Sequence, residues 1–134
     1  MPTGTQATNA RQYPAQMIHY LRKSITFADN GTTVTVGTIP AGALILKPAS
    51  GVAVNVAFNG GTTNTLDIGA STDVGTNNFA TILALGSIAF VPIDEAVTNL
   101  VAVDTVIQAA VVSTAGATTG QAEIIIAYIP DNDG

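Results

Sequence analysis

The feature that most constrains the fold is an alternation of apolar residues in the middle of the chain. From Val52 to Phe58 every second residue is large and apolar, while the residues between them are small or polar. A period of two is typical of a β-strand that buries one face. An Asn-Gly-Gly turn signal follows at residues 59–61, and the alternation then resumes. The pattern predicts a β-hairpin over residues 52–69, whose apolar face needs cover from a second sheet or a neighbouring subunit.

Turn signals divide the rest of the chain into short segments of the same kind. They recur roughly every eight to twelve residues, a spacing typical of β-sandwiches, and no stretch carries a sustained helical period. We therefore expect an all-β fold, a jelly-roll-like antiparallel β-sandwich of about eight to ten strands. Besides the hairpin, strands are expected near residues 18–28, 33–36, 43–47, 87–93, 100–103, 106–112 and 121–129.

Two segments fit more than one structure. Pro14 suits the first turn of a helix and residues 17, 18 and 21 share a helical face, but residues 21–27 also alternate as a strand does. Because the downstream pattern is so uniformly β, we favour a strand from residue 18 to about residue 28, followed by a hairpin turn at residues 29–31. Residues 79–85 fit either a single helical turn or a strand.

Local signals also place individual strands. Pro92 donates no ladder hydrogen bond, so strand 87–93 is expected at a sheet edge or to end there. The three consecutive isoleucines at residues 124–126 predict that strand 121–129 is covered on both faces. Asp104 and Thr105 are expected to form a tight link between the strands at residues 100–103 and 106–112.

The length of 134 residues indicates one domain, which we place at residues 14–134. Residues 1–13 are small and polar, so we expect an extended N-terminal arm. Such an arm is either a disordered terminus or a strap that orders across a neighbouring subunit. It has no basic start followed by an apolar block, so no secretory signal is expected.

Charged residues make up only 10% of the chain, and the net charge is −5. Its four fixed cations, Arg11, Arg22, Lys23 and Lys47, form no basic patch with aromatic residues, so nucleic-acid binding is not expected. The uncharged run at residues 74–93 contains glycine, asparagine and proline, so we expect no membrane span. A surface this poor in charge is covered by Thr, Asn and Ser or packed against other protein.

No group of residues predicts a catalytic, cofactor or metal site. The chain has no cysteine, and its only histidine, His19, has no partner at a recognisable motif spacing. The acids are scattered at expected turns, where an aspartate usually caps its own backbone. Residues 131–134 (DNDG) match only the start of a calcium loop. Residues 116–120 lack the Lys and Ser/Thr of a phosphate loop.

A glycosidase pair, formed by two carboxylates that meet across the sheet, is an open alternative. Proteins that cleave or bind sugars usually display aromatic platforms, and the chain has no tryptophan and three tyrosines. We therefore expect a protein that is not an enzyme.

Four motifs resemble those of a known class of proteins: GTIPAGA (Gly37 to Ala43), AFNG (Ala57 to Gly60), TLDIG (Thr65 to Gly69) and ATTGQAEI (Ala117 to Ile124). Together they resemble small structural proteins encoded among the virion genes of tailed bacteriophages, of the head decoration or cement type. The similarity extends over residues 25–130 and does not include the first two dozen residues.

This resemblance implies a non-enzymatic virion protein, made in the host cytoplasm, that sits on the outer surface of the capsid and clamps adjacent capsomers. Its partners would be further copies of itself and the major capsid protein, with neither nucleic acid nor membrane involved. A homotrimer is expected, with a dimer as the second choice. The alternative is the β-domain of a head spike, tail fibre or tail accessory protein that contacts the host surface.

Overall fold

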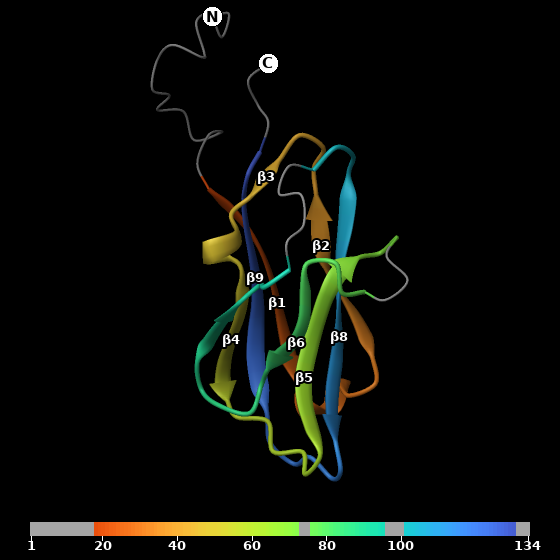
Figure 1. Cartoon of the computed structure of the whole chain (residues 1–134), viewed down its shortest axis with the longest axis vertical. Helices are drawn as coiled ribbons and strands as arrows, with labels where there is room; N and C mark the ends of the chain where they lie inside the picture. The colour runs from red at the N-terminus through yellow and green to blue at the C-terminus, as the bar shows by residue number, and fades with distance from the viewer. Residues whose placement is uncertain (1–17, 73–75, 96–100, 131–134) are drawn as a thin grey trace, which may run out of the picture.

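The computed structural model describes residues 18–72, 76–95 and 101–130. In this part of the chain two antiparallel sheets pack face to face, with both ends of the described chain at the same end of the sandwich (Figure 1). Sheet A has the strand order β1-β9-β4-β7, with β3 also paired to β9, and sheet B has the order β2-β8-β5-β6. The strands are β1 His19–Thr26, β2 Thr33–Ile39, β3 Leu44–Ile45, β4 Gly51–Val56, β5 Thr63–Ala70, β6 Ala80–Ala84, β7 Phe90–Pro92, β8 Thr105–Thr114 and β9 Gln121–Ile129, and two 3₁₀ turns lie at η3 Phe27–Asp29 and η4 Lys47–Ala49.

The order of the strands is that of a jelly roll. Strands β3 and β4 pair with successive parts of β9 and are separated only by η4, so they act as one interrupted strand. Each sheet then has four strands, and every connection except β5 to β6 crosses from one sheet to the other. The predicted jelly-roll-like β-sandwich is confirmed.

The predicted hairpin over residues 52–69 is wrong, although both of its strands are present. Strand β4 pairs with β7 and β9 in sheet A, whereas β5 pairs with β6 and β8 in sheet B. The turn at residues 29–31 likewise joins β1 in sheet A to β2 in sheet B. A turn signal shows where the chain reverses direction, but it does not show that the two flanking strands pair with each other. Strand β5 pairs instead with the long strand β8, over eight residues.

A β-bulge also changes the face of one predicted core residue. Val54 pairs with Ala122 and Val56 pairs with Gln121, so β4 holds one more residue than β9 between these pairs. The extra residue turns Val56 outward, where its side chain is 42% exposed. Val54 and Phe58 are buried, as are Val52 and the inward residues of the neighbouring strands.

The expected strands at residues 100–103 and 106–112 are replaced by one strand, β8, which is preceded by irregular chain at residues 101–104. Leu100 lies outside the described residues. Asp104 does not form a tight link between strands, because its carboxylate accepts the backbone N–H of Ala41 at 2.9 Å and fixes this segment to the turn before β3.

Other local expectations have mixed outcomes. The ambiguous segments 18–23 and 79–85 are both strands, as β1 and β6, and residues 14–17 lie outside the described part. Pro92 lies in β7, the edge strand of sheet A, as predicted. The expected cover on both faces of β9 is wrong within the chain: Ile124 and Ile126 are buried, but Ile125 faces outward and is half-buried.

The core lies between the sheets and is built from their inward rows. Phe58 closes one end of it, packed against Gly120, where an added Cβ would lie 2.6 Å from the phenylalanine ring. The largest fully buried apolar side chains are Ile25, Ile39, Val52, Leu66, Ile68, Leu85, Ile107, Val111, Ile124 and Ile126.

The hydroxyl of Ser50 replaces a backbone hydrogen-bond partner that β9 loses where β3 and β4 are interrupted. This fully buried hydroxyl accepts the backbone N–H of Ala127 at 2.9 Å and donates to the carbonyl of Leu46 at 2.8 Å. The N–H of Leu46 in turn donates to the carbonyl of Ala127 at 2.8 Å. The hydroxyl therefore satisfies a β9 backbone group that lost its strand partner.

Replacing Ser50 by alanine leaves the N–H of Ala127 buried without an acceptor. We expect Ser50→Ala to lower the free energy of unfolding by about 1 to 3 kcal/mol, measured by urea denaturation. The matched control is Ser24→Ala on the exposed face of β1, which should change stability by less than about 0.5 kcal/mol. Equal stability of the two variants would contradict this role for the hydroxyl.

Truncating Phe58 should open a cavity beside Gly120. We expect Phe58→Ala to cost about 3 to 5 kcal/mol of stability. Phe90→Ala, at a phenylalanine that is 46% exposed, serves as the control and should cost clearly less. Comparable losses in the two variants would show that Phe58 is not a core residue.

Candidate interaction surface

The described residues hold no group of side chains assembled to bind a metal ion. No group of three or more His, Cys, Asp and Glu residues in this part of the chain is placed to hold a metal ion. His19 packs at the start of β1, with its ring stacked on that of Tyr128 at a centroid distance of 5.7 Å. The calcium-like residues 131–134 lie outside the described part. Within the described ranges, no helix is long and apolar enough to cross a membrane.

The aspartates that the structure describes all bind the backbone, but only Asp29 caps its own turn as expected; the other three bind N–H groups 13 to 63 residues away in the chain. Each accepts a hydrogen bond from a main-chain N–H at 2.7 to 3.1 Å, which occupies its carboxylate with a structural contact. The pairs are Asp29 with Thr26, Asp67 with Ile82, Asp94 with Thr81, and Asp104 with Ala41.

One ion pair lies on the outward face of sheet A. The Nε of Arg22 in β1 donates to Glu123 in β9 at 3.1 Å, and a second guanidinium nitrogen contacts the same carboxylate oxygen. The hydrogen bond to Glu123, together with the charge of that carboxylate, raises the pKa of Arg22. The side chain of Arg22 remains 62% exposed, so water screens the pair and its cationic side chain stays available at the β1 edge.

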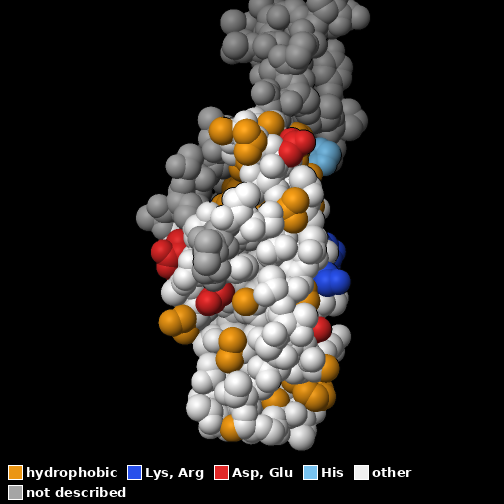
Figure 2. Space-filling view, turned by 90° about the vertical axis from the view of Figure 1, so that its right-hand side faces the viewer, with side chains coloured by type: hydrophobic (Ala, Val, Ile, Leu, Met, Phe, Trp, Pro, Cys, Tyr) orange, Lys and Arg blue, Asp and Glu red, His pale blue; other side chains and the backbone are white. Residues whose placement is uncertain are grey.

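The outward face of sheet B is nearly uncharged. On the side of β2, β5 and β8, Figure 2 shows mostly uncharged side chains and backbone, with charged groups toward the margins. By strand register, its outward positions are Thr33, Thr35, Thr38, Thr63, Thr65, Asp67, Gly69, Ala84, Val106, Gln108, Ala110, Val112 and Thr114. Asp67 is the only charged residue among them, so threonine and small apolar groups form this face.

The exposed large apolar residues form two groups, one at the end of the sandwich where β1 begins and one along the edge formed by β6 and β7. One group, the terminal patch, surrounds the start of β1 and the end of β9 and comprises Ile18, Tyr20, Leu44 and Val103, which are 42 to 67% exposed. The other group, the β6–β7 edge patch, comprises Val56, Ile82, Ile88 and Phe90, which are 42 to 72% exposed. Hydrogen bonds from Val54 to Ala89 and from Phe58 to Leu85 place the β6–β7 loop beside the end of β4.

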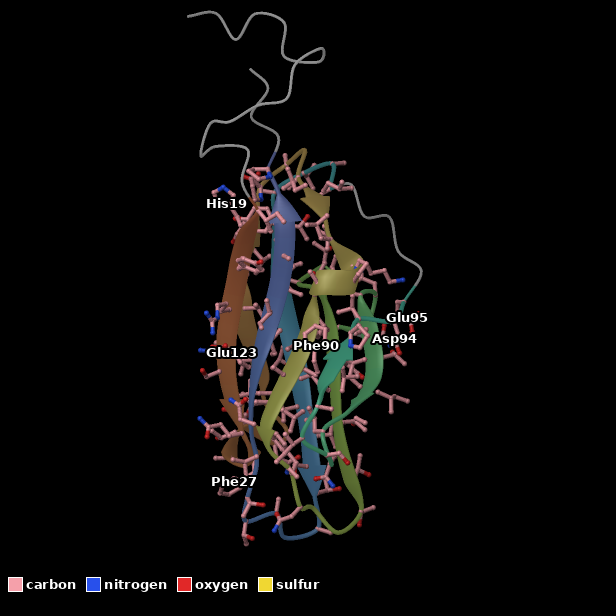
Figure 3. All side chains as sticks on the ribbon, turned by 90° about the vertical axis from the view of Figure 1, so that its left-hand side faces the viewer. His19, Phe27, Phe90, Asp94, Glu95 and Glu123 are labelled. Carbon is pink, nitrogen blue, oxygen red and sulfur yellow. The ribbon has the colours of Figure 1, made fainter. Side chains whose placement is uncertain are left out.

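Acidic residues adjoin the β6–β7 edge patch. Figure 3 shows Asp94 and Glu95 on the side of sheet A where β7 lies, and Glu123 on the side of β1. Asp67 faces outward on β5, next to β6. Large apolar side chains edged by charge are the usual composition of a surface that binds another protein.

Ile82 holds an unusual backbone conformation in this patch. Between the pairs Leu66 with Leu83 and Ile68 with Ala80, β6 contains one more residue than β5. At this bulge Ile82 has a φ of +54°, which β-branched residues rarely adopt, and its side chain is 67% exposed. Asp67 and Asp94 accept the N–H groups of Ile82 and Thr81, so two carboxylates hold the bulge.

The sequence had not singled out this patch. Residues 79–93 are apolar almost throughout, so no alternation separated the inward side chains from the outward ones. The bulge in β6 and the edge position of β6 arise from strand pairing, which local sequence does not specify.

No family model and no curated protein matches the chain. Two solved structures share its fold. A chain in the acidic stable capsid structure of Helicobacter pylori bacteriophage KHP30 superposes with a TM-score of 0.65 at 14% identity, over 86% of this chain and 89% of that chain. A chain in the capsid asymmetric unit of cyanophage Pam1 superposes with a TM-score of 0.62 at 18% identity, over 97% and 99% of the two chains.

The strain at the bulge predicts a stabilising substitution. Asparagine adopts a positive φ more readily than isoleucine, so Ile82→Asn should raise the free energy of unfolding by about 1 kcal/mol. The control is Ile88→Asn, because Ile88 is similarly exposed but has no positive φ. A thermal melt in which Ile82→Asn is no more stable than Ile88→Asn would argue against strain at this residue.

Proposed function

We propose that this chain is a non-enzymatic bacteriophage virion structural protein that decorates and cements the outside of the capsid. In this role it is made in the host cytoplasm and bridges neighbouring capsomers as an oligomer, a homotrimer in the first instance. The observation that carries the proposal is the nearly complete fold match to a chain of the Pam1 capsid, which covers 97% of this chain and 99% of that one. The resemblance of its turn-and-strand motifs to those of virion structural proteins supports the same role independently.

The described surface suits a protein that works by contact. The outward face of sheet B is rich in threonine, and the β6–β7 edge patch presents apolar side chains beside acids. The described aspartates are engaged with backbone N–H groups, which leaves them no evident catalytic task. A lattice of many copies binds tightly through individually weak contacts, because each attached subunit raises the effective concentration for the next.

The proposed domain organisation is an arm at residues 1–13 followed by one sandwich domain at residues 14–134. The pair His19 with Tyr128 places the start of β1 beside the end of β9. The first described residue, Ile18, therefore lies at the terminal patch, where Leu44 and Val103 are also exposed. An arm that straps a neighbouring subunit would start from this end of the sandwich.

A head spike, tail fibre or tail accessory domain is the second candidate. The loops at the end opposite the terminal patch are cross-linked by asparagine side chains: Asn59 accepts the N–H groups of Thr118 and Thr119, and Asn64 accepts that of Gly60. These two loops, residues 57–62 and 115–120, contain no charged residue, and a surface of this kind also suits contact with a host surface. Copy number distinguishes the two roles, because cement occurs in hundreds of copies over the head and a spike in a few copies at one vertex or the tail.

Sedimentation with expanded empty capsids of the phage that encodes this chain tests the leading proposal. We expect the purified protein to pellet with the capsids in hundreds of copies per shell, and a variant lacking residues 1–13 to stay folded but to pellet less. Protein that remains in the supernatant would remove the cement role and favour the spike or fibre. Equal binding of the truncated variant would instead show that the arm takes no part in attachment.

A further inference from the structure

The two long edges of the sandwich differ in charge. The β1 edge carries Arg22 and Lys23, both exposed, and Glu123 on the neighbouring β9 is paired with Arg22, so two positive charges and one negative charge leave this edge with a net charge of +1. The β6–β7 edge carries Asp94 and Glu95, Asp67 adjoins it on the neighbouring β5, and Lys47 in the nearby η4 offsets only one of these three charges. One edge is therefore basic and the opposite edge is acidic, although the chain as a whole has few charges.

The strand register places these charges at the same level along the sandwich. Across sheet A, Arg22 pairs with Ile125, Ile125 with Gly51, and Gly51 with Pro92. Arg22 thus lies in the row that ends at Pro92, two residues before Asp94, and Lys23 lies in the adjacent row, which ends at Val91. A second copy displaced sideways, with its long axis in the same direction, brings its β1 edge level with residues 92–95 of the first.

Apolar side chains accompany the charges on both edges. Tyr20 is 55% exposed on the outward row of β1, two residues before Arg22, and Phe90 is 46% exposed on the outward row of β7. Ile82 and Ile88 extend the apolar surface of the acidic edge. Each edge therefore offers an apolar area next to a net charge opposite in sign to that of the other edge, a combination that favours specific association.

Neither edge of sheet A is suited to adding a backbone strand. Lys23 pairs with the buried Ile124 and so lies on the inward row of an edge strand, which is a common device against edge-to-edge pairing. On the other edge Pro92 lacks an N–H. Contacts between copies are therefore made by side chains.

We infer that the β1 edge of one copy binds the β6–β7 edge of the next, in a heterologous interface that closes into a ring. Pairing of like edges is disfavoured, since it would set Lys23 against Lys23 or Glu95 against Glu95. Copies placed side by side in the same direction carry all their terminal patches, and hence the starts of all their β1 strands, at one end of the ring. This inference names the interface of the oligomer that the proposed function assumes.

Charge reversal tests the interface in solution. The wild-type protein is expected to be oligomeric by light scattering at low salt and to dissociate as salt is raised, because exposed charges are screened. Lys23→Glu and Glu95→Lys should each weaken association by about tenfold or more, and the double variant Lys23→Glu/Glu95→Lys should regain it. Thr62→Glu and Thr62→Lys, in the exposed β4–β5 loop, are matched controls that should leave the mass unchanged.

Engineered cysteines determine which edges meet. The chain has no cysteine, and the row Ser24, Glu123, Ala53, Phe90 places Ser24 and Phe90 three strands apart, or roughly 14 Å at about 4.8 Å per strand. In the double variant Ser24→Cys/Phe90→Cys, a bis-maleimide whose spacer is too short to span this distance cannot join the two cysteines of one subunit. It should therefore join different subunits and yield covalent closed oligomers. Each single variant should stay uncross-linked.

The outcomes separate this inference from the proposed function. A monomeric wild-type protein at all concentrations, failure of the double charge variant to reassociate while circular dichroism shows it folded, or cross-linking of a single-cysteine variant would overturn the interface. A ring that behaves as expected but does not bind capsids would overturn the cement role and leave the interface standing.

Discussion

The fold depends on the burial of one apolar row from each sheet against the other. Each sheet is only one layer thick and cannot bury its own apolar face. The inward side chains of β9 and β4 are therefore shielded from water only by packing against those of β5 and β8. This requirement explains why nearly every connection crosses between the sheets: a strand and its successor in sequence supply opposite sides of the same core. It also explains why Ser50 is buried, because β9 lies at the centre of sheet A and its backbone must stay paired through the interruption between β3 and β4.

Concentrating the large apolar residues in the core leaves the outward faces to small ones. The face of sheet B presents threonine, alanine and valine, and its single charge, Asp67, is bound to the bulge at Ile82. The other described aspartates are likewise occupied by backbone N–H groups. The aspartates that the structure describes thus fix loops and a bulge.

The two edges of the sandwich differ from each other in the side chains that they expose. Open edges invite uncontrolled pairing, and here Lys23, Pro92 and the bulge in β6 each oppose it. The same features make the edges unlike: a basic edge with Tyr20 stands opposite an acidic edge with Phe90 and Ile82. Blocking backbone pairing while leaving complementary side chains exposed permits one defined contact between copies in place of many.

The sequence alone determined the all-β class, the jelly-roll-like sandwich, the edge position of Pro92 and the full extent of β9 at residues 121–129. These features follow from alternation and turn residues, which act over a few positions. The pairing of strands was decided only by the tertiary structure: β4 and β5 form no hairpin, because alternation specifies which face is buried but not which strand lies alongside. The bulges that expose Val56 and Ile82, and the opposition of the charged edges, depend on pairing between residues far apart in the chain, and so no local pattern predicted them.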